Sequence, residues 1–398
     1  MAFTGGRGGR GGRGGRGGRG GRGGRGFDGG RGGRGGRSLD EIGGDTQVSA
    51  ALAVAREGAI GYWQNPGPSS VPAHHTGNEP TNLRLWNEEV RHEILLGIIL
   101  EDISFDASNT MAMVCVGNGK QLVRLERPSE QELSAQVDLV FGYSQLRLER
   151  LDEIATQLDD ITSFMGSVVG LRPERHRYTL ELLDIFLSAT IAIEMRLKHH
   201  LAVRRPVEFA PQLQPVIDTP GHGAYPSGHA TESFVVAYIL NMLTGGNIID
   251  PARTRQQLMR HAERIANNRV VAGVHFPVDN AAGMVLAASL AEYFRARCTG
   301  IPADEEGKQA TPYQVVSRAF AMDDENFSKS DDFDYEHVET KFITQPEQTE
   351  QPESETPAEQ QNQKGPDAAP EVITRETAEI SVDPTLQWLW NKAAAEWG

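Results

Sequence analysis

Three short segments of the chain place basic and titratable residues beside glycine, proline or serine. They read KHHLAVRRP at 198–206, AYPSGHATESF at 224–234 and NRVVAGVHFPVDN at 268–280. Lysine and arginine supply positive charge, and histidine can bind or release a proton near neutral pH. The combination predicts a site that holds a multiply charged anion and moves protons beside it.

The second segment contains Pro226-Ser227-Gly228-His229 just before the apolar run FVVAYIL, which predicts a turn that opens a helix. The first N–H groups of a helix have no partner within it and favour an anion. Gly228 lets a ligand approach the backbone, and the Ser227 hydroxyl can donate to it. His229 would move protons there. The alternative interpretation is a serine cap followed by a surface histidine.

In the third segment, Arg269 stands six residues before His275, and Asp279 stands four residues after it. The arginine suits an oxyanion, and the histidine can offer a ring nitrogen to a phosphorus or metal-like centre. Asp279 can fix the histidine tautomer through the other ring nitrogen. Because Asp279 directly precedes NAAGMVLAASLAEYF, it also suits the cap of a helix, and the two roles are compatible.

In the first segment, Lys198 and Arg205 are seven residues apart, or about two helical turns. Both would face one pocket if the helix runs on towards Pro206, which is expected to end it. The alternative is an ordinary basic helix end, favoured by the helix dipole.

Together the segments read Lys-x6-Arg-Pro, then 19 residues, Pro-Ser-Gly-His, then 38 residues, Asn-Arg-x5-His-x3-Asp. This order and spacing resembles the signature of the superfamily of type-two phosphatidic acid phosphatases, bacterial acid phosphatases and vanadium-dependent haloperoxidases. Asn268 departs from the pattern, which usually has serine there, and we expect this position to be peripheral to the anion. The resemblance covers 198–280 by motif, and 84–296 if the surrounding helices belong to the same bundle.

The resemblance implies an oxyanion pocket that holds vanadate in a haloperoxidase or phosphate in a phosphatase. The groups that would bind the equatorial oxygens are Lys198, Arg205, Ser227, the Gly228 amide and Arg269. His275 would be the axial group, bonded to vanadium or attacking phosphorus, and His229 would be the acid–base residue. Preorganised cations and donors of this kind stabilise a charged oxyanion.

Three features favour the haloperoxidase branch. The segment LWNEEVRHEI (85–94) resembles the early Trp-Asn helix of haloperoxidase-like proteins, and HGAYPSGHAT resembles their second motif. No apolar run reaches the about 18 residues of a membrane span, which disfavours the integral-membrane lipid phosphatases. His222 matches a second histidine of the algal bromoperoxidases, where the fungal chloroperoxidase has phenylalanine. By that resemblance His222 would tune halide preference towards bromide or iodide; the alternative is a loop histidine without a catalytic role.

The leading hypothesis is therefore a vanadate-dependent haloperoxidase that uses hydrogen peroxide and a halide, with Lys198 polarising the oxidant. The second hypothesis is a soluble acid phosphatase acting on phosphomonoesters through a phosphohistidine at His275, with His229 protonating the leaving group. The third is a non-catalytic scaffold or RNA-binding protein that acts through its tails.

The elements that must position these residues are predicted to be helices. The stretch 83–102 has apolar residues near helical spacing, and similar patterns fall at 176–197, 230–244, 252–266 and 280–296. Strict alternation of apolar and polar residues is rare. We therefore expect an all-α helical bundle of the haloperoxidase/acid phosphatase type over 45–320, as the catalytic domain. One chain has room for about one full bundle, so a homodimer is a further hypothesis.

The two ends of the chain differ in charge. Residues 1–37 hold ten arginines and one aspartate in Gly-Gly-Arg repeats, and we expect 1–44 to be a disordered tail. It would bind RNA or another polyanion, or act only as a solubilising tail. Residues 321–382 are predicted to be an acidic, disordered linker. Residues 383–398 are predicted to form a short tryptophan-rich helix that docks on a partner or folds back on the core.

Composition excludes several classes of protein. The net charge is −15, which argues against a uniformly basic nucleic-acid binder. Two cysteines, Cys115 and Cys298, exclude a disulfide scaffold, a four-cysteine zinc site and a four-thiolate iron–sulfur cluster; two buried thiols are expected. No secretory signal is recognisable, so a cytoplasmic location is expected.

Overall fold

The computed structural model describes residues 46–60, 74–245, 248–299, 314–344, 373–377 and 380–398. The chain divides into two compact units at about residue 82. The first contains helix α2 (Thr46–Ile60) and the start of the short helix η2 (Pro80–Leu85). The Gly/Arg tail and its predicted binding of RNA lie outside the described residues.

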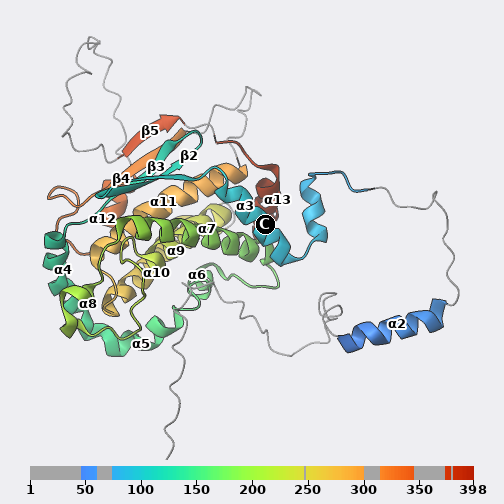
Figure 1. The fold of residues 1–398 in the computed structure, drawn as a ribbon, viewed down its shortest axis with the longest axis horizontal. Coiled ribbons are helices and arrows are strands. Elements are labelled where there is room, and N and C mark those ends of the chain that lie inside the picture. Colours follow the sequence, from blue (N-terminus) through green and yellow to red (C-terminus); the bar gives the residue numbers. More distant parts are fainter. Residues whose placement is uncertain (1–45, 61–73, 246–247, 300–313, 345–372, 378–379) are drawn as a thin grey trace, which may run out of the picture. The chain divides into compact units, whose positions relative to one another are not determined.

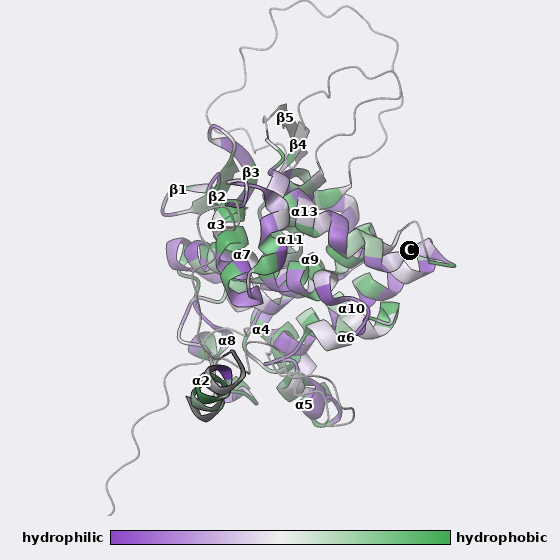
Figure 2. Ribbon diagram, turned by 90° about the vertical axis from the view of Figure 1, so that its right-hand side faces the viewer, coloured by the Kyte–Doolittle hydropathy of each residue, from purple (hydrophilic) through white to green (hydrophobic). Residues whose placement is uncertain are grey.

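The core of the second unit is built from four long helices, drawn together in Figure 1. They are α7 (Arg177–Leu201), α9 (Gly228–Thr244), α10 (Pro251–Val271) and α11 (Pro277–Thr299). Helix α11 is buried on nearly all sides because its sequence is apolar or small almost throughout, and Figure 2 shows it among other apolar stretches. The four corresponding predicted helices are present, each with somewhat longer bounds.

Shorter helices surround this core: α3 (Glu88–Leu100), α4 (Glu130–Tyr143), η3 (Ser144–Leu146), α5 (Arg147–Thr156), α6 (Thr162–Val169), α8 (Pro206–Phe209) and η4 (Pro211–Leu213). Helix α3 begins where the Trp-Asn segment predicted a helix. The Asn87 side chain caps it by accepting a hydrogen bond of 3.0 Å from the Val90 N–H. None of the helices among the described residues is long and apolar enough to cross a membrane.

The prediction of an all-α fold is wrong in one respect, because the second unit also carries a five-stranded sheet. Its strands are β1 (Ser104–Ala107), β2 (Met111–Val116), β3 (Lys120–Glu126), β4 (Gln314–Phe320) and β5 (Ile373–Thr377), in that order. Only the β3–β4 pair is parallel. The sheet packs on α7 and α11. All six residues of β2, MAMVCV, are apolar, so its sequence lacks the alternation of apolar and polar residues that identifies a half-exposed strand.

The predicted acidic linker is partly folded. Within residues 321–344, helix α12 (Tyr335–Val338) and the π-helical turn η5 (Glu339–Ile343) lie against the core. Phe327, Phe333 and Phe342 are buried there. These three apolar side chains anchor a segment whose overall composition is acidic, so the prediction of disorder is wrong for this part of it.

The C-terminal segment folds back on the core, which was one of the two alternatives predicted for it. Helix α13 (Pro384–Ala394) and η6 (Ala395–Trp397) pack on α7. The Asp383 side chain caps α13 by accepting from the N–H groups of Thr385 and Leu386. The Glu396 carboxylate accepts hydrogen bonds from the N–H groups of Tyr178 and Thr179, which have no acceptor within α7 because they lie in its first turn.

Both cysteines are buried thiols, without a disulfide.

Candidate active site

The first motif segment lies at the end of α7. Helix α7 stops at Leu201, because Ala202 takes a left-handed conformation with φ of 47°. The predicted continuation towards Pro206 is therefore wrong. The side chains of Lys198 and Arg205 are nevertheless both buried. Lys198 donates to the Ala224 carbonyl oxygen at the start of the second segment, and Arg205 donates to that of Gly223, the residue just before it.

The Lys198 ammonium group holds the loop in front of α9. Its Nζ atom donates to the carbonyl oxygens of Ala224, at 3.2 Å, and Pro226. Burial lowers the pKa of this lysine to about 8. Gly223 completes the fit, since a Cβ atom there would lie 3.0 Å from the Lys198 carbonyl oxygen. Lys198 thus brings a positive charge to the loop and fixes its path.

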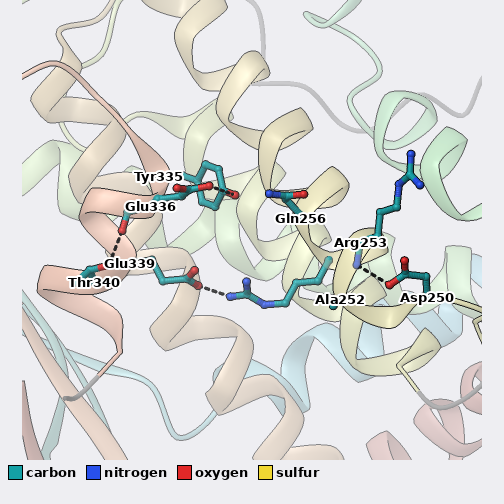
Figure 3. Close-up of a pocket in the computed structure, with 9 residues that line it drawn as sticks. Asp250, Ala252, Arg253, Gln256, Tyr335, Glu336, Glu339 and Thr340 are labelled. Atoms are coloured by element: carbon teal, nitrogen blue, oxygen red, sulfur yellow. Dashed lines mark hydrogen bonds and ion pairs between the residues drawn. The ribbon is translucent and has the colours of Figure 1, made fainter. Parts of the chain in front are cut away.

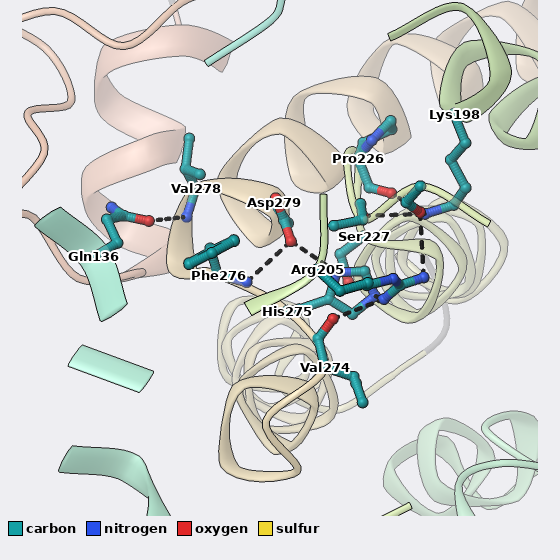
Figure 4. Close-up of polar contacts among 12 residues, drawn as sticks. Gln136, Lys198, Arg205, Pro226, Ser227, Val274, His275, Phe276, Val278 and Asp279 are labelled. Atoms are coloured by element: carbon teal, nitrogen blue, oxygen red, sulfur yellow. Dashed lines mark hydrogen bonds and ion pairs between the residues drawn. The ribbon is translucent and has the colours of Figure 1, made fainter. Parts of the chain in front are cut away.

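Arg205 joins the first segment to the third and to the two residues just before the second, as Figure 4 shows in part. Its guanidinium donates to the carbonyl oxygens of His222 at 3.1 Å, Gly223 at 3.2 Å and Val274 at 2.7 Å. Its Nη1 atom lies 2.9 Å from His275 Nε2, and its Nη2 atom 3.2 Å from His222 Nδ1. Burial lowers the pKa of Arg205 only to about 10, so it stays charged at neutral pH. His222 therefore lies in the cluster and not in a detached loop.

His275 and Asp279 form a buried pair just before and within the first turn of α11. The His275 Nδ1 and Asp279 Oδ2 atoms are 2.9 Å apart, and the same oxygen accepts from the Phe276 N–H at 2.9 Å. Burial, followed by the charges of Arg205 and Lys198, puts the pKa of His275 well below its usual value. A neutral ring that donates through Nδ1 keeps its lone pair on Nε2.

The second segment opens α9, as its sequence predicted. Ser227 precedes the helix, and its buried Oγ atom has no hydrogen-bond partner among the described residues. Gly228 is the first helical residue. His229 is half-buried and not a surface residue; its Nε2 atom lies 3.0 Å from the Gln157 carbonyl oxygen. Burial, together with nearby Arg269, lowers the pKa of His229 to about 3, so the ring is neutral.

Arg269 lies near the end of α10 and is almost completely buried. Its Nη2 atom donates to the Ile154 carbonyl oxygen and to Gln157 Oε1, both at 3.0 Å. Its Nε and Nη1 atoms have no partner among the described residues. Burying an N–H group of a cation without an acceptor is costly. These two donors and the Ser227 hydroxyl therefore fit a tetrahedral oxyanion.

Two residues that sequence reasoning missed or discounted support this arrangement. Gln157, just after α5, contacts Arg269 through its side chain and His229 through its carbonyl oxygen. Asn268 is fully buried and donates to Gln157 Oε1 at 3.0 Å and Glu153 Oε1 at 2.9 Å. The departure from serine at this position thus ties α10 to α5. No motif marks Gln157, because its contacts with His229 and Arg269 span 72 and 112 residues of sequence.

A separate open groove of about 730 Å³ lies between the start of α10 and the α12–η5 segment (Figure 3). Its Arg255 side chain pairs with Glu339, and Asp250 caps α10 by accepting from the Arg253 N–H. None of its lining residues belongs to a motif segment. The chemistry that the sequence predicts is therefore not in this groove.

Comparison with known protein families agrees with the geometry. Residues 179–297 match the model of the PAP2 superfamily. This region belongs to the PAP2 superfamily. The matched stretch starts in α7 and ends in α11, so it includes all three motif segments of the PAP2 region. No curated protein gives a significant match to the sequence. The family spans phosphatases and haloperoxidases and its members are typically enzymes.

Proposed function

We propose that this PAP2-superfamily protein is a vanadate-dependent haloperoxidase, which oxidises bromide or iodide with hydrogen peroxide to hypohalous acid. The observation that carries the proposal is a set of buried donors on Ser227 and Arg269 that have no partner within the described part of the chain, beside a histidine paired with Asp279. Bound vanadate would activate hydrogen peroxide as a Lewis acid, and the vanadium would keep its oxidation state.

The residues of the site would have different roles. Arg269, Ser227 and the Gly228 amide would donate to the oxygens of the anion. Lys198 and Arg205 keep the site positive while their hydrogens hold the loops in place. His275 would offer Nε2 to the vanadium in place of its present contact with Arg205 Nη1, and Asp279 holds the proton on Nδ1.

His229 is the candidate for proton transfer. Its pKa is low because the ring is buried beside cations, and a bound anion would raise it by offsetting those charges. His229 would then take or give a proton at the anion's edge. His222 is neutral at neutral pH, since burial and the charge of Lys198 lower its pKa to about 4. Its place beside Arg205 supports a role in halide preference.

The second candidate is an acid phosphatase, favoured by the His275–Asp279 pair alone. The Nε2 lone pair would attack phosphorus, forming an N–P bond and breaking the P–O bond to the leaving group. His229 would protonate the leaving alkoxide, and water would then hydrolyse the phosphohistidine.

The predicted homodimer and cytoplasmic location stay predictions.

A paired assay on one preparation distinguishes these candidates. Bromide and iodide oxidation with peroxide is followed after orthovanadate is added, and aryl phosphate hydrolysis is followed without it. We expect halide oxidation that needs vanadate and disappears in His275→Ala, with His199→Ala, an exposed histidine on the same helix as Lys198, as the control. Phosphate hydrolysis that vanadate only inhibits would instead establish the phosphatase.

A further inference from the structure

A buried carboxylate that no motif predicted lies against the proposed anion site. Glu194 is one helical turn before Lys198 on α7 and only 1 % exposed. A Cβ atom at Gly228 would lie 2.8 Å from Glu194 Oε1, so the carboxyl group packs directly on the first residue of α9. Its Oε2 atom has no hydrogen-bond partner among the described residues. A carboxyl group that can become an anion therefore already lies at the edge of the proposed anion site.

The charges around Glu194 come from three elements. Lys198 lies on the same helix, Arg205 stands just before α8, and Glu232 is one turn into α9 and 7 % exposed. Burial raises the pKa of Glu194 to about 7, while Lys198 and Arg205 oppose that rise. Burial and the nearby Glu194 also put the pKa of Glu232 well above its usual value. The Lys198 ammonium group donates to the backbone carbonyl oxygens of Ala224 and Pro226, and not to the Glu194 carboxyl group.

We propose that the carboxyl group of Glu194 is part of the anion site and must carry a proton when a tetrahedral dianion binds. The inference rests on the proposed function, because it takes the oxyanion site as given. A carboxylate and a dianion repel each other strongly in a buried site. The protonated carboxyl removes that repulsion and supplies an O–H donor. Binding thus takes one proton from solvent and leaves it on Glu194.

The probe is sulfate, a tetrahedral dianion whose own charge stays constant from about pH 6 to about pH 8. Affinity is measured by titration calorimetry, and the protonation state of carboxyl groups by infrared difference spectroscopy. At about pH 8 we expect sulfate to generate a carboxylic-acid C=O band in the wild type, and Glu194→Gln to lack that band. We also expect Glu194→Gln to bind sulfate about tenfold more tightly at this pH, since one pKa unit corresponds to a factor of ten.

The control is Asp184→Asn, which removes a half-exposed carboxylate from the same helix. It should leave both the band and the sulfate affinity unchanged. Sulfate binding to the wild type without a carboxylic-acid band overturns the inference, even if Glu194→Gln does not fold. Unchanged affinity in a folded Glu194→Gln overturns it as well. A folded wild type that binds no sulfate at about pH 6 contradicts the proposed function itself and removes the basis of the inference.

Discussion

The two halves of the candidate site differ in how their donors are used. In one half, Lys198 and Arg205 donate to backbone carbonyl oxygens, and His275 is paired with Asp279. In the other half, Ser227 and Arg269 keep buried donors without a partner among the described residues. We call these the closed half and the open half.

This difference indicates that different residues supply the positive charge of the site and the hydrogen-bond donors available to a ligand. A donor that already has a backbone acceptor gains little from a ligand, whereas an unpartnered buried donor gains a full hydrogen bond. The closed half should therefore set the shape and potential of the site, and the open half should set its affinity. Substitutions in the two halves are expected to have separable effects.

The largest effect is expected in the open half. Arg269→Gln should weaken orthovanadate binding about 1000-fold, or about 4 kcal/mol, because two charge-assisted hydrogen bonds and a cation are lost. Equilibrium dialysis against orthovanadate measures this. Arg260→Gln, an exposed arginine on the same helix, is the matched control. A loss of less than about tenfold would contradict the assignment of the open half.

Substitutions in the closed half should mainly lower the free energy of unfolding. Arg205→Lys should lower the free energy of unfolding by about 3 kcal/mol, because buried carbonyl oxygens of His222, Gly223 and Val274 lose donors. Urea unfolding of the variant and the wild type measures this. Arg204→Lys, at the exposed neighbouring position, should change the free energy little. Equal stability of the Arg205 variant would remove the distinction between the halves.

The pair in the closed half should affect turnover more than binding. Asp279→Asn should lower halide oxidation by about 10- to 100-fold, because the proton on His275 Nδ1 loses its charged acceptor. Steady-state rates at saturating vanadate measure this. If the rate is unchanged, Asp279 serves the Phe276 N–H and the start of α11 but not the tautomer.

The smallest effect concerns pH and His229. Its folded-state pKa is lowered to about 3, so between about pH 6.5 and about pH 3 the unfolded chain binds a proton that the folded chain does not. Stability is therefore lost as pH falls through that window. His229→Gln should reduce the loss between pH 7 and pH 5 by about 1 kcal/mol, discounted because the ring is only half-buried. Urea unfolding at both pH values measures the difference; an unaltered loss would argue against a neutral, buried ring.

Much of the site could be predicted because its residues lie in three short segments with local chemical meaning. Proline, glycine and serine before an apolar run fix where α9 begins, and the spacing of His275 and Asp279 fixes their pairing. Gln157 and Glu194 could not be predicted in the same way. Their contacts depend on how α5 and α7 pack against α9 and α10, and no local pattern specifies that.

The fold was predictable to a similar degree. The long helices follow from apolar spacing, but the sheet does not, because β2 is apolar throughout and β4 comes from a distant part of the chain. One signal was present in the sequence: Gly117-Asn118-Gly119 all have positive φ and join β2 to β3 as a hairpin. Such a turn after the apolar run MAMVCV favours strands over helices.

The central claim is that the three motif segments of the PAP2 region form one oxyanion site whose affinity resides in the open half. The most direct test is the binding of orthovanadate to the wild type, Ser227→Ala and Arg205→Lys, each shown to be folded. We predict one vanadate per chain in the wild type, displaced by phosphate. We also predict a larger loss of affinity in Ser227→Ala than in Arg205→Lys. No stoichiometric binding by the wild type, or a larger loss in Arg205→Lys, would contradict the account.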